Sequence, residues 1–177
     1  NNFNTIRIGF AKDAASGEYS AMVVMPISAR AAGFASQLTT QFERQFPYWL
    51  GDEFSQISTE LIWQLSLEFS SVSAVNFTEF ELAQVHAFVD GKLQYSPTAP
   101  ALWHWCILYL KDIPQDKIPH VLMQRCLQKH TWKSLSEQQG LPGKKAILSH
   151  IKNELKLAMS AIQRSLSMTN TDTSDKN

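Results

Sequence analysis

The chain has 177 residues, 44% of them hydrophobic, and its 16 Lys and Arg side chains are balanced by 16 Asp and Glu side chains. This length and composition can bury one full hydrophobic core, so the fold requires neither a metal nor a disulfide framework. The longest apolar run, Leu102–Leu110, is shorter than the roughly 20 residues of a membrane span. No charged-then-apolar leader opens the sequence, which argues against a signal peptide.

The charges are sorted along the chain although they cancel in total. Residues 1–110 carry five Lys and Arg against ten Asp and Glu, whereas residues 111–166 carry ten against four. An acidic, aromatic-rich part is therefore joined to a basic part, and such asymmetry is typical of proteins with a polyanionic partner.

Two cysteines, Cys106 and Cys126, both lie in apolar helical contexts. A free thiol in such a place behaves as a small hydrophobic group. Their number and spacing do not resemble the disulfide framework of a secreted protein, so we expect a reducing, cytoplasmic environment and no membrane association.

A β-hairpin is the first element that the sequence predicts. Residues 5–10 alternate in side-chain character, and residues 19–25 form a second β-prone run. Turn-forming residues fill positions 12–17 between them. Pro26 ends the second run, because proline cannot donate to a strand ladder.

Two helices are predicted next. Small and apolar side chains recur at helical spacing over residues 29–46. Pro47 is predicted to end this helix, because the residue before a proline is pushed out of the α region. The second helix, over residues 52–69, has an apolar side made of Phe54, Ile57, Leu61, Ile62, Leu65 and Phe69.

The next two helices differ in character. Thr78 and Glu81 have the spacing of a capping box, which predicts a helix start there and a helix running to Val89. A helix over residues 96–111 is apolar nearly all round, and a helix without a polar face belongs in the middle of a core. We therefore expect this helix to be central, with Trp103 and Trp105 as core residues.

The basic part is predicted to be helical throughout. A helix over residues 118–129 is followed by a short one over 132–139, after which Gly140 suits the left-handed position at a helix end. A long amphipathic helix follows over residues 144–166. The polar tail, residues 167–177, is predicted to be disordered.

These elements predict a mainly α fold: a single helical domain with an N-terminal β-hairpin and a C-terminal helix-turn-helix-like unit ending in a long amphipathic helix. Within it, residues 1–112 form the acidic, aromatic-rich part and residues 113–166 the basic part. The helix-turn-helix outline is inexact, because the better core residues of the second helix require a connector about two residues longer than the tight form has.

The long helix has two distinct sides. Its apolar stripe consists of Ile147, Ile151, Leu155, Ala158 and Ile162. Lysines spaced by three and four residues lie on another side and, with Gly143 before them, are typical of a phosphate-binding surface. The predicted nucleic-acid-binding residues are Lys133, Lys144, Lys145, Ser149, Lys152, Asn153 and Lys156. An ordinary solvated lysine face is the alternative interpretation.

Other residue combinations do not support a chemical site. The segment 140–145 is too short for a phosphate-binding loop and lacks Ser or Thr after its lysines. His104, Cys106, Cys126 and His130 are the residue types of a zinc site, but His104 and Cys106 point about 200° apart on a helix. We predict no metal, no cofactor and no catalytic residue, although catalytic groups can also meet in space without a sequence motif.

Two groups of residues are predicted to contact a protein partner. Phe46, Tyr48 and Trp49 form an aromatic cluster beside a Pro-Gly break, and such clusters can anchor an interface. The stripe residues Ile147, Ile151 and Leu155 would contact a partner or a second copy in a homodimer if the core does not cover them.

The sequence thus favours a non-enzymatic, nucleic-acid-associated regulatory or accessory protein, with DNA as the expected partner of the basic helix. The alternative is a protein–protein adaptor or chaperone-like component of a larger assembly, docking through the long helix or the hairpin. Phosphate binding weakens steeply with salt and apolar docking does not, which distinguishes the two.

Overall fold

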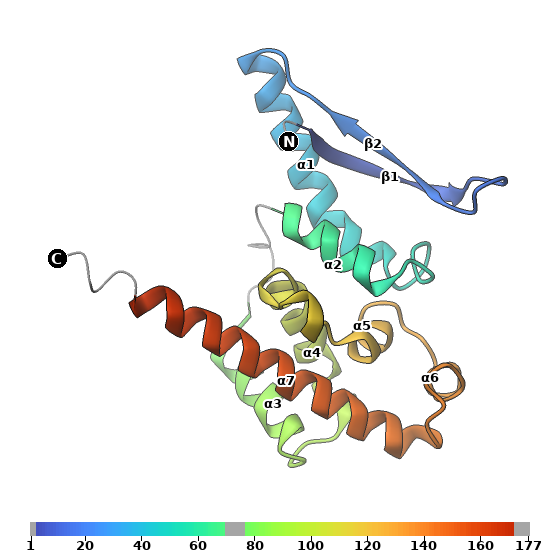
Figure 1. Cartoon of the computed structure of the whole chain (residues 1–177), viewed down its shortest axis with the longest axis vertical. Coiled ribbons are helices and arrows are strands. Elements are labelled where there is room, and N and C mark those ends of the chain that lie inside the picture. Colours follow the sequence, from blue (N-terminus) through green and yellow to red (C-terminus); the bar gives the residue numbers. More distant parts are fainter. Residues whose placement is uncertain (1–2, 70–76, 172–177) are drawn as a thin grey trace.

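A computed structural model describes residues 3–69 and 77–171 and confirms the predicted fold class. A two-stranded hairpin and α1 form one end of the molecule, and α3 to α7 form the other (Figure 1). The elements in chain order are β1 (Asn4–Lys12), β2 (Tyr19–Val24), α1 (Ala29–Trp49), α2 (Thr59–Glu68), α3 (Glu79–Val89), α4 (Tyr95–Tyr109), α5 (His120–Cys126), α6 (Trp132–Gln139) and α7 (Gly143–Thr171), with 3₁₀ turns at Leu110–Asp112 and Gln115–Lys117.

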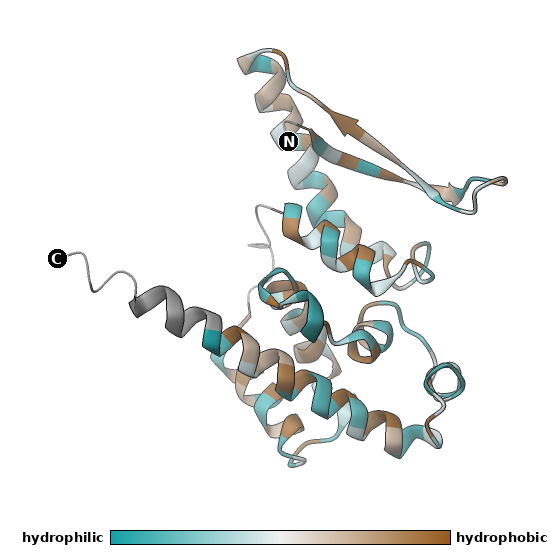
Figure 2. Ribbon diagram, viewed as in Figure 1, coloured by the Kyte–Doolittle hydropathy of each residue, from teal (hydrophilic) through white to brown (hydrophobic). Residues whose placement is uncertain are grey.

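The hairpin is antiparallel and packs on α1 through β1. Asp13 shapes its turn by accepting hydrogen bonds from the backbone N–H groups of Ala15 and Ser16. Ile8 is buried, but β2 is exposed along most of its length, including Met22 at 56% and Val23 at 49%. The hydrophobic colour along β2 marks this exposed strand in Figure 2.

Helix α1 runs three residues past its predicted end and contains Pro47. The prediction failed because a proline in the last turn removes only one N–H donor, and the helix closes without that bond. Ser28 caps the start of α1 by accepting from the N–H of Ala31. Phe42 and Phe46 are the large apolar side chains that α1 buries.

Helix α2 begins at Thr59, later than the predicted start at residue 52. Residues 51–56 form turns, in which Asp52 and Phe54 donate their N–H groups to the Trp49 carbonyl. A distant side chain holds this segment, because Gln128 Nε2 donates to the carbonyls of Ser55 at 3.0 Å and Ile57 at 2.6 Å. The helix starts only after Ser58, whose hydroxyl caps it.

Helix α3 starts with the predicted capping box, in which Thr78 and Glu81 each accept from the other's backbone. Helix α4 buries six of its 15 residues, and Trp105 is 2% exposed. Trp103 is only half-buried and contacts Tyr48 of α1 at 6.5 Å between ring centroids.

The basic part contains three helices. Helix α5 ends at Cys126, earlier than predicted, and is followed by Lys129 in the left-handed region (φ 59°). Gly140 ends α6 in the left-handed conformation, as predicted. Helix α7 continues to Thr171, past the predicted end at residue 166, so residues 167–171 are not disordered. The rest of the predicted tail, 172–177, lies outside the described residues.

Helix α7 is anchored in the core along its whole apolar stripe. Ile147, Ile151 and Leu155 have no exposed surface. On a neighbouring side, the Glu154 carboxylate accepts from the N–H groups of Val121 and Leu122 at 3.1 and 2.9 Å, tying α7 to the start of α5. In the described part of the chain, no helix is long and apolar enough to cross a membrane.

Candidate nucleic-acid interface

A surface groove of about 460 Å³ lies between the start of α7 and the loop that joins α3 to α4. One wall comes from the basic part of the chain and the other from the acidic part. The residues that line it are Phe88, Gly91, Leu93, Gln94, Tyr95, Ser96, Lys144, Lys145, Leu148, Ser149 and Lys152.

The burial of α7 determines which of its side chains reach the groove. Ile147 and Ile151 point into the core, so residues on the adjacent side of the helix face outward. Lys145, Ser149 and Lys152 repeat at intervals of four and three residues and therefore share that side. The structure thus brings together four of the seven predicted binding residues: these three and Lys144.

The opposite wall depends on a left-handed glycine. Gly91 has φ +80°, which allows the chain to turn sharply after α3. The N–H groups of Lys92 and Leu93 then donate to the Ala87 carbonyl, which brings Leu93 to the groove. A Cβ at Gly91 would lie 3.6 Å from Lys152 Nζ, so the loop and the lysine are close neighbours.

Aromatic rings hold two of the groove lysines. Lys152 Nζ lies 5.1 Å from the ring centroid of Phe88, and Lys144 Nζ lies 5.2 Å from that of Trp132. Both distances are within cation–π range. None of the ion pairs among the described residues involves Lys144, Lys145 or Lys152.

Asp90, near the groove, already forms an ion pair. Asp90 pairs with Lys92 at 2.9 Å. This hydrogen bond is the main reason that the pKa of Asp90 lies below its ordinary value, with the charges of Lys92 and, more weakly, His86 and Lys156 acting the same way. Asp90 therefore stays ionised, and its nearest cation is not a groove lysine.

An aromatic and cationic cluster adjoins the groove through Tyr95, which lines it. The Arg125 guanidinium lies 4.5 Å from the Trp132 centroid and 5.4 Å from that of Tyr95, and the two rings are 5.0 Å apart. Arg125 also donates to the His130 carbonyl at 2.6 Å. Burial raises the pKa of the Tyr95 hydroxyl, which stays neutral. Sequence reasoning missed this cluster, because its members belong to three different helices and no local pattern links them.

The other predicted binding residues lie outside the groove. Lys133 of α6 is 87% exposed and has Glu137 at 4.0 Å as an ion-pair partner. Asn153 and Lys156 are exposed farther along α7 and do not line the groove.

Most of the predicted partner-contacting residues are inside the protein. Phe46 is a buried residue of α1, and Ile147, Ile151 and Leu155 belong to the core. Trp49 is half-buried against Phe10 and Phe54, with ring centroids 5.1 and 6.1 Å away. Tyr48, at 77%, is the exposed member of the set. The chain itself therefore covers the long-helix stripe, because α3, α5 and α6 pack against α7.

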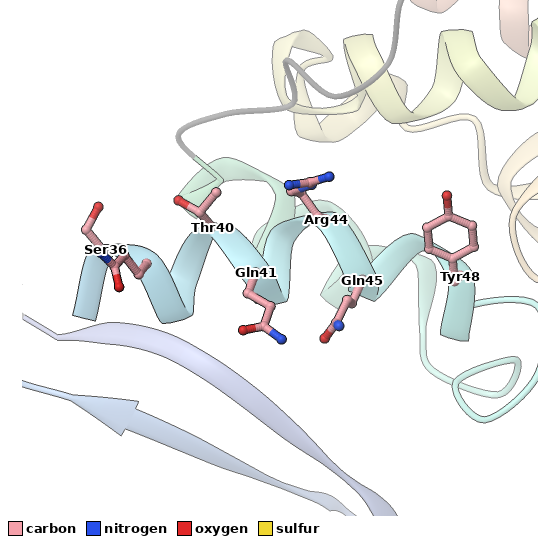
Figure 3. Close-up of a pocket in the computed structure, with 7 residues that line it drawn as sticks. Ser36, Thr40, Gln41, Arg44, Gln45 and Tyr48 are labelled. Atoms are coloured by element: carbon pink, nitrogen blue, oxygen red, sulfur yellow. The ribbon is translucent and has the colours of Figure 1, made fainter. Parts of the chain in front are cut away.

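A second hollow, of about 670 Å³, follows the polar side of α1 (Figure 3). Ser36, Thr40, Arg44 and Tyr48 project from one side of the helix, while Gln41 and Gln45 project toward the hairpin. Arg44 is the one charged residue among those lining it. This surface is polar but weakly charged, so it is a poorer phosphate site than the lysine groove.

The thiols and imidazoles considered for chemistry have structural contacts. Cys106 and Cys126 are free and buried. His104 pairs with Glu81, and His130 Nε2 hydrogen-bonds to the Ser55 carbonyl at 2.8 Å. Over residues 3–69 and 77–171, no group of three or more His, Cys, Asp or Glu side chains is placed to hold a metal ion.

The chain is similar to curated proteins of one kind. It is 26% identical over 145 residues to tRNA(Met) cytidine acetyltransferase TmcA of Thermococcus kodakarensis, a match covering 77% of this chain and 18% of that protein. The TmcA proteins of Vibrio cholerae and Yersinia pestis are 24% and 26% identical over 155 and 160 residues, covering 88% and 90% of this chain and 21% of each relative. The chain thus spans about a fifth of the length of the curated relatives it matches. No family model matches it.

These relatives contradict the function predicted from the sequence. Their name describes an enzyme that modifies tRNA, whereas the sequence pattern predicts a non-enzymatic, DNA-associated regulator or, as the alternative, an adaptor or chaperone-like component. The physical reason for the error is that lysines recognise phosphate, which DNA and RNA share. A basic helix side therefore indicates a polyanion and cannot identify which nucleic acid it is.

Proposed function

We propose that this chain is a segment of a tRNA cytidine acetyltransferase and that its basic groove holds the tRNA. The observation that carries the proposal is the groove itself. Three lysines converge there without a carboxylate partner among the described residues, in a chain similar over most of its length to enzymes named for tRNA.

Electrostatics supports a phosphate ligand in this groove. Lysines that already have a carboxylate partner gain little from a phosphate, whereas Lys144, Lys145 and Lys152 have none among the described residues. Each phosphate that they neutralise releases a condensed counterion, and this release drives binding.

The hairpin supports a position inside a larger enzyme. Met22, Val23 and Met25 are about half exposed and Ile27 is 89% exposed. Apolar side chains gathered on an exposed strand and on the segment that follows it mark a surface that another structure covers. We propose that the rest of the enzyme, about four-fifths of its length in the relatives, covers this strand.

The tRNA proposal is tested by reversing two charges of the groove. Lys145→Glu combined with Lys152→Glu should lower the affinity for tRNA roughly a hundredfold at low salt, because two phosphate contacts become repulsive. The matched control is Lys12→Glu combined with Arg30→Glu, which changes the net charge equally at two exposed positions on the hairpin and at the start of α1.

Affinity is measured by filter binding or anisotropy, and urea unfolding checks that each variant folds. The control should bind tRNA nearly as the wild type does. Equal losses in both double variants would show that net charge, and not the groove, governs binding. Unchanged affinity in the groove variant would overturn the proposal.

A further inference from the structure

We infer that the groove takes an unpaired nucleotide, with the base on its apolar floor and the flanking phosphates on its lysines. This inference rests on the proposed RNA-binding function and adds the form of RNA that is recognised. The inference rests on the lysines of the groove, which lie beside half-buried leucines and buried aromatic residues.

The floor is more apolar than a phosphate site requires. Leu93 of the α3–α4 loop and Leu148 of α7 are half-buried there, and the buried residues Phe88 and Tyr95 also line the groove. A duplex backbone presents only phosphates and hydroxyls, which leave such a floor without a partner. The flat, weakly polar face of an unpaired base would bury it.

The size of the groove suits a small ligand group. Its volume of about 460 Å³ lies within the range of small-molecule sites, which is about 300–1,000 Å³. A base splayed out of a loop is a group of this class, whereas a paired base inside a helix cannot enter.

The lysines are positioned before any RNA arrives. Cation–π contacts hold Lys152 over Phe88 and Lys144 over Trp132, so these long side chains lose less conformational freedom on binding. Gly91 lies beside Lys152, because a Cβ at this position would be 3.6 Å from the ammonium nitrogen.

The test compares two RNA probes on the whole 177-residue chain. One probe is a stem-loop RNA, and the other is a blunt duplex with the same stem. The groove is then filled without changing charge by Ser149→Trp. The matched control is Ser160→Trp, an exposed serine farther along α7 that does not line the groove.

The wild type should prefer the stem-loop about tenfold, the value expected for one stacked base. Ser149→Trp should abolish that preference, which is the ratio of the two affinities, and Ser160→Trp should retain it. Leu93→Ser, a loop substitution, should also weaken the preference.

The possible failures separate the two proposals. If the wild type binds both probes equally, or if Ser149→Trp keeps the preference, the nucleotide inference is overturned while a charge-reversal loss would still support RNA binding. If tRNA affinity is insensitive to Lys145→Glu with Lys152→Glu, the proposed function fails as well.

Discussion

Glu81 links two helices through a single carboxylate. It accepts hydrogen bonds from the backbone N–H of Thr78 at 2.9 Å and from the Thr78 hydroxyl at 3.1 Å, and it pairs with His104 of α4. The Thr78 backbone contact is the main reason, and the His104 hydrogen bond the next, that the pKa of Glu81 lies below its ordinary 4.5.

This lowered pKa predicts an acid-sensitive contribution to stability. A carboxyl group with a lower pKa in the folded state stabilises the fold above its ordinary pKa, and this contribution is lost as the pH falls through the folded value. Unfolding free energy measured between about pH 3 and pH 6 should therefore fall more steeply in the wild type than in Glu81→Gln. Parallel pH profiles would contradict this assignment.

The Thr78 hydroxyl caps α3 by accepting from the N–H of Glu81, and removing it has a predictable effect. Thr78→Ala should lower the unfolding free energy by about 1 kcal/mol, the usual value of a helix N-cap, whereas Thr78→Ser should cost much less because it keeps the hydroxyl. Urea denaturation measures both. Equal losses in the two variants would show that the hydroxyl does not act as a cap.

At the residue scale, the sequence reveals contacts that are close along the chain. The Thr78–Glu81 box and the left-handed Gly140 were predicted, because their partners lie within a few residues. The Glu81–His104 pair and the Arg125–Trp132–Tyr95 cluster were not, because helix packing brings those residues together from far apart in the sequence.

Among the elements, the turn between α6 and α7 sets the start of the basic helix. Gly140 at φ +61° ends α6, and a Cβ there would meet nothing within 4 Å. Gly140→Ala should therefore destabilise through backbone strain alone, by about 1 kcal/mol, with Gly140→Asn less affected. Gly33→Ala, also in open space but inside α1, should stabilise by about 0.5–1 kcal/mol.

Thermal or urea unfolding would show these opposite signs. Destabilisation by both substitutions would mean that the conformation of Gly140 is not the controlling factor.

Element boundaries were predictable where local signals dominate and failed where tertiary contacts do. The caps of α3 and α6 follow from the sequence. The late start of α2 does not, because Gln128 holds residues 54–57 in turns through backbone carbonyls more than 70 positions away. The lysine side of α7 followed from helical periodicity, but the opposite groove wall required the folded α3–α4 loop.

In the whole molecule, one cluster of buried residues extends from Ile8 of the hairpin to Ile162 of α7. The groove joins the two oppositely charged parts of the sequence, because the acidic part supplies its floor loop and the basic part its lysines. The sorting of charges along the sequence predicts a polyanion-binding surface but does not show that both parts of the chain line the groove.

The exposed strand gives a prediction at this scale. Amides of β2 that do not bond to β1 should exchange with solvent quickly in the isolated chain. They should exchange slowly in the longer protein of which we propose this chain is a segment, because we expect the rest of that protein to cover β2. Hydrogen-exchange mass spectrometry resolves the two states. Equal exchange in both would place the covering surface elsewhere.

The most direct test of the central claim is a salt titration of tRNA binding to the wild type and to Lys145→Glu with Lys152→Glu. If the groove lysines hold phosphates, wild-type affinity should fall steeply between about 50 and 200 mM salt. The slope of log affinity against log salt should be shallower in the variant by about 1.4, about 0.7 for each phosphate contact removed. Equal slopes, or wild-type binding that salt does not change, would contradict the claim.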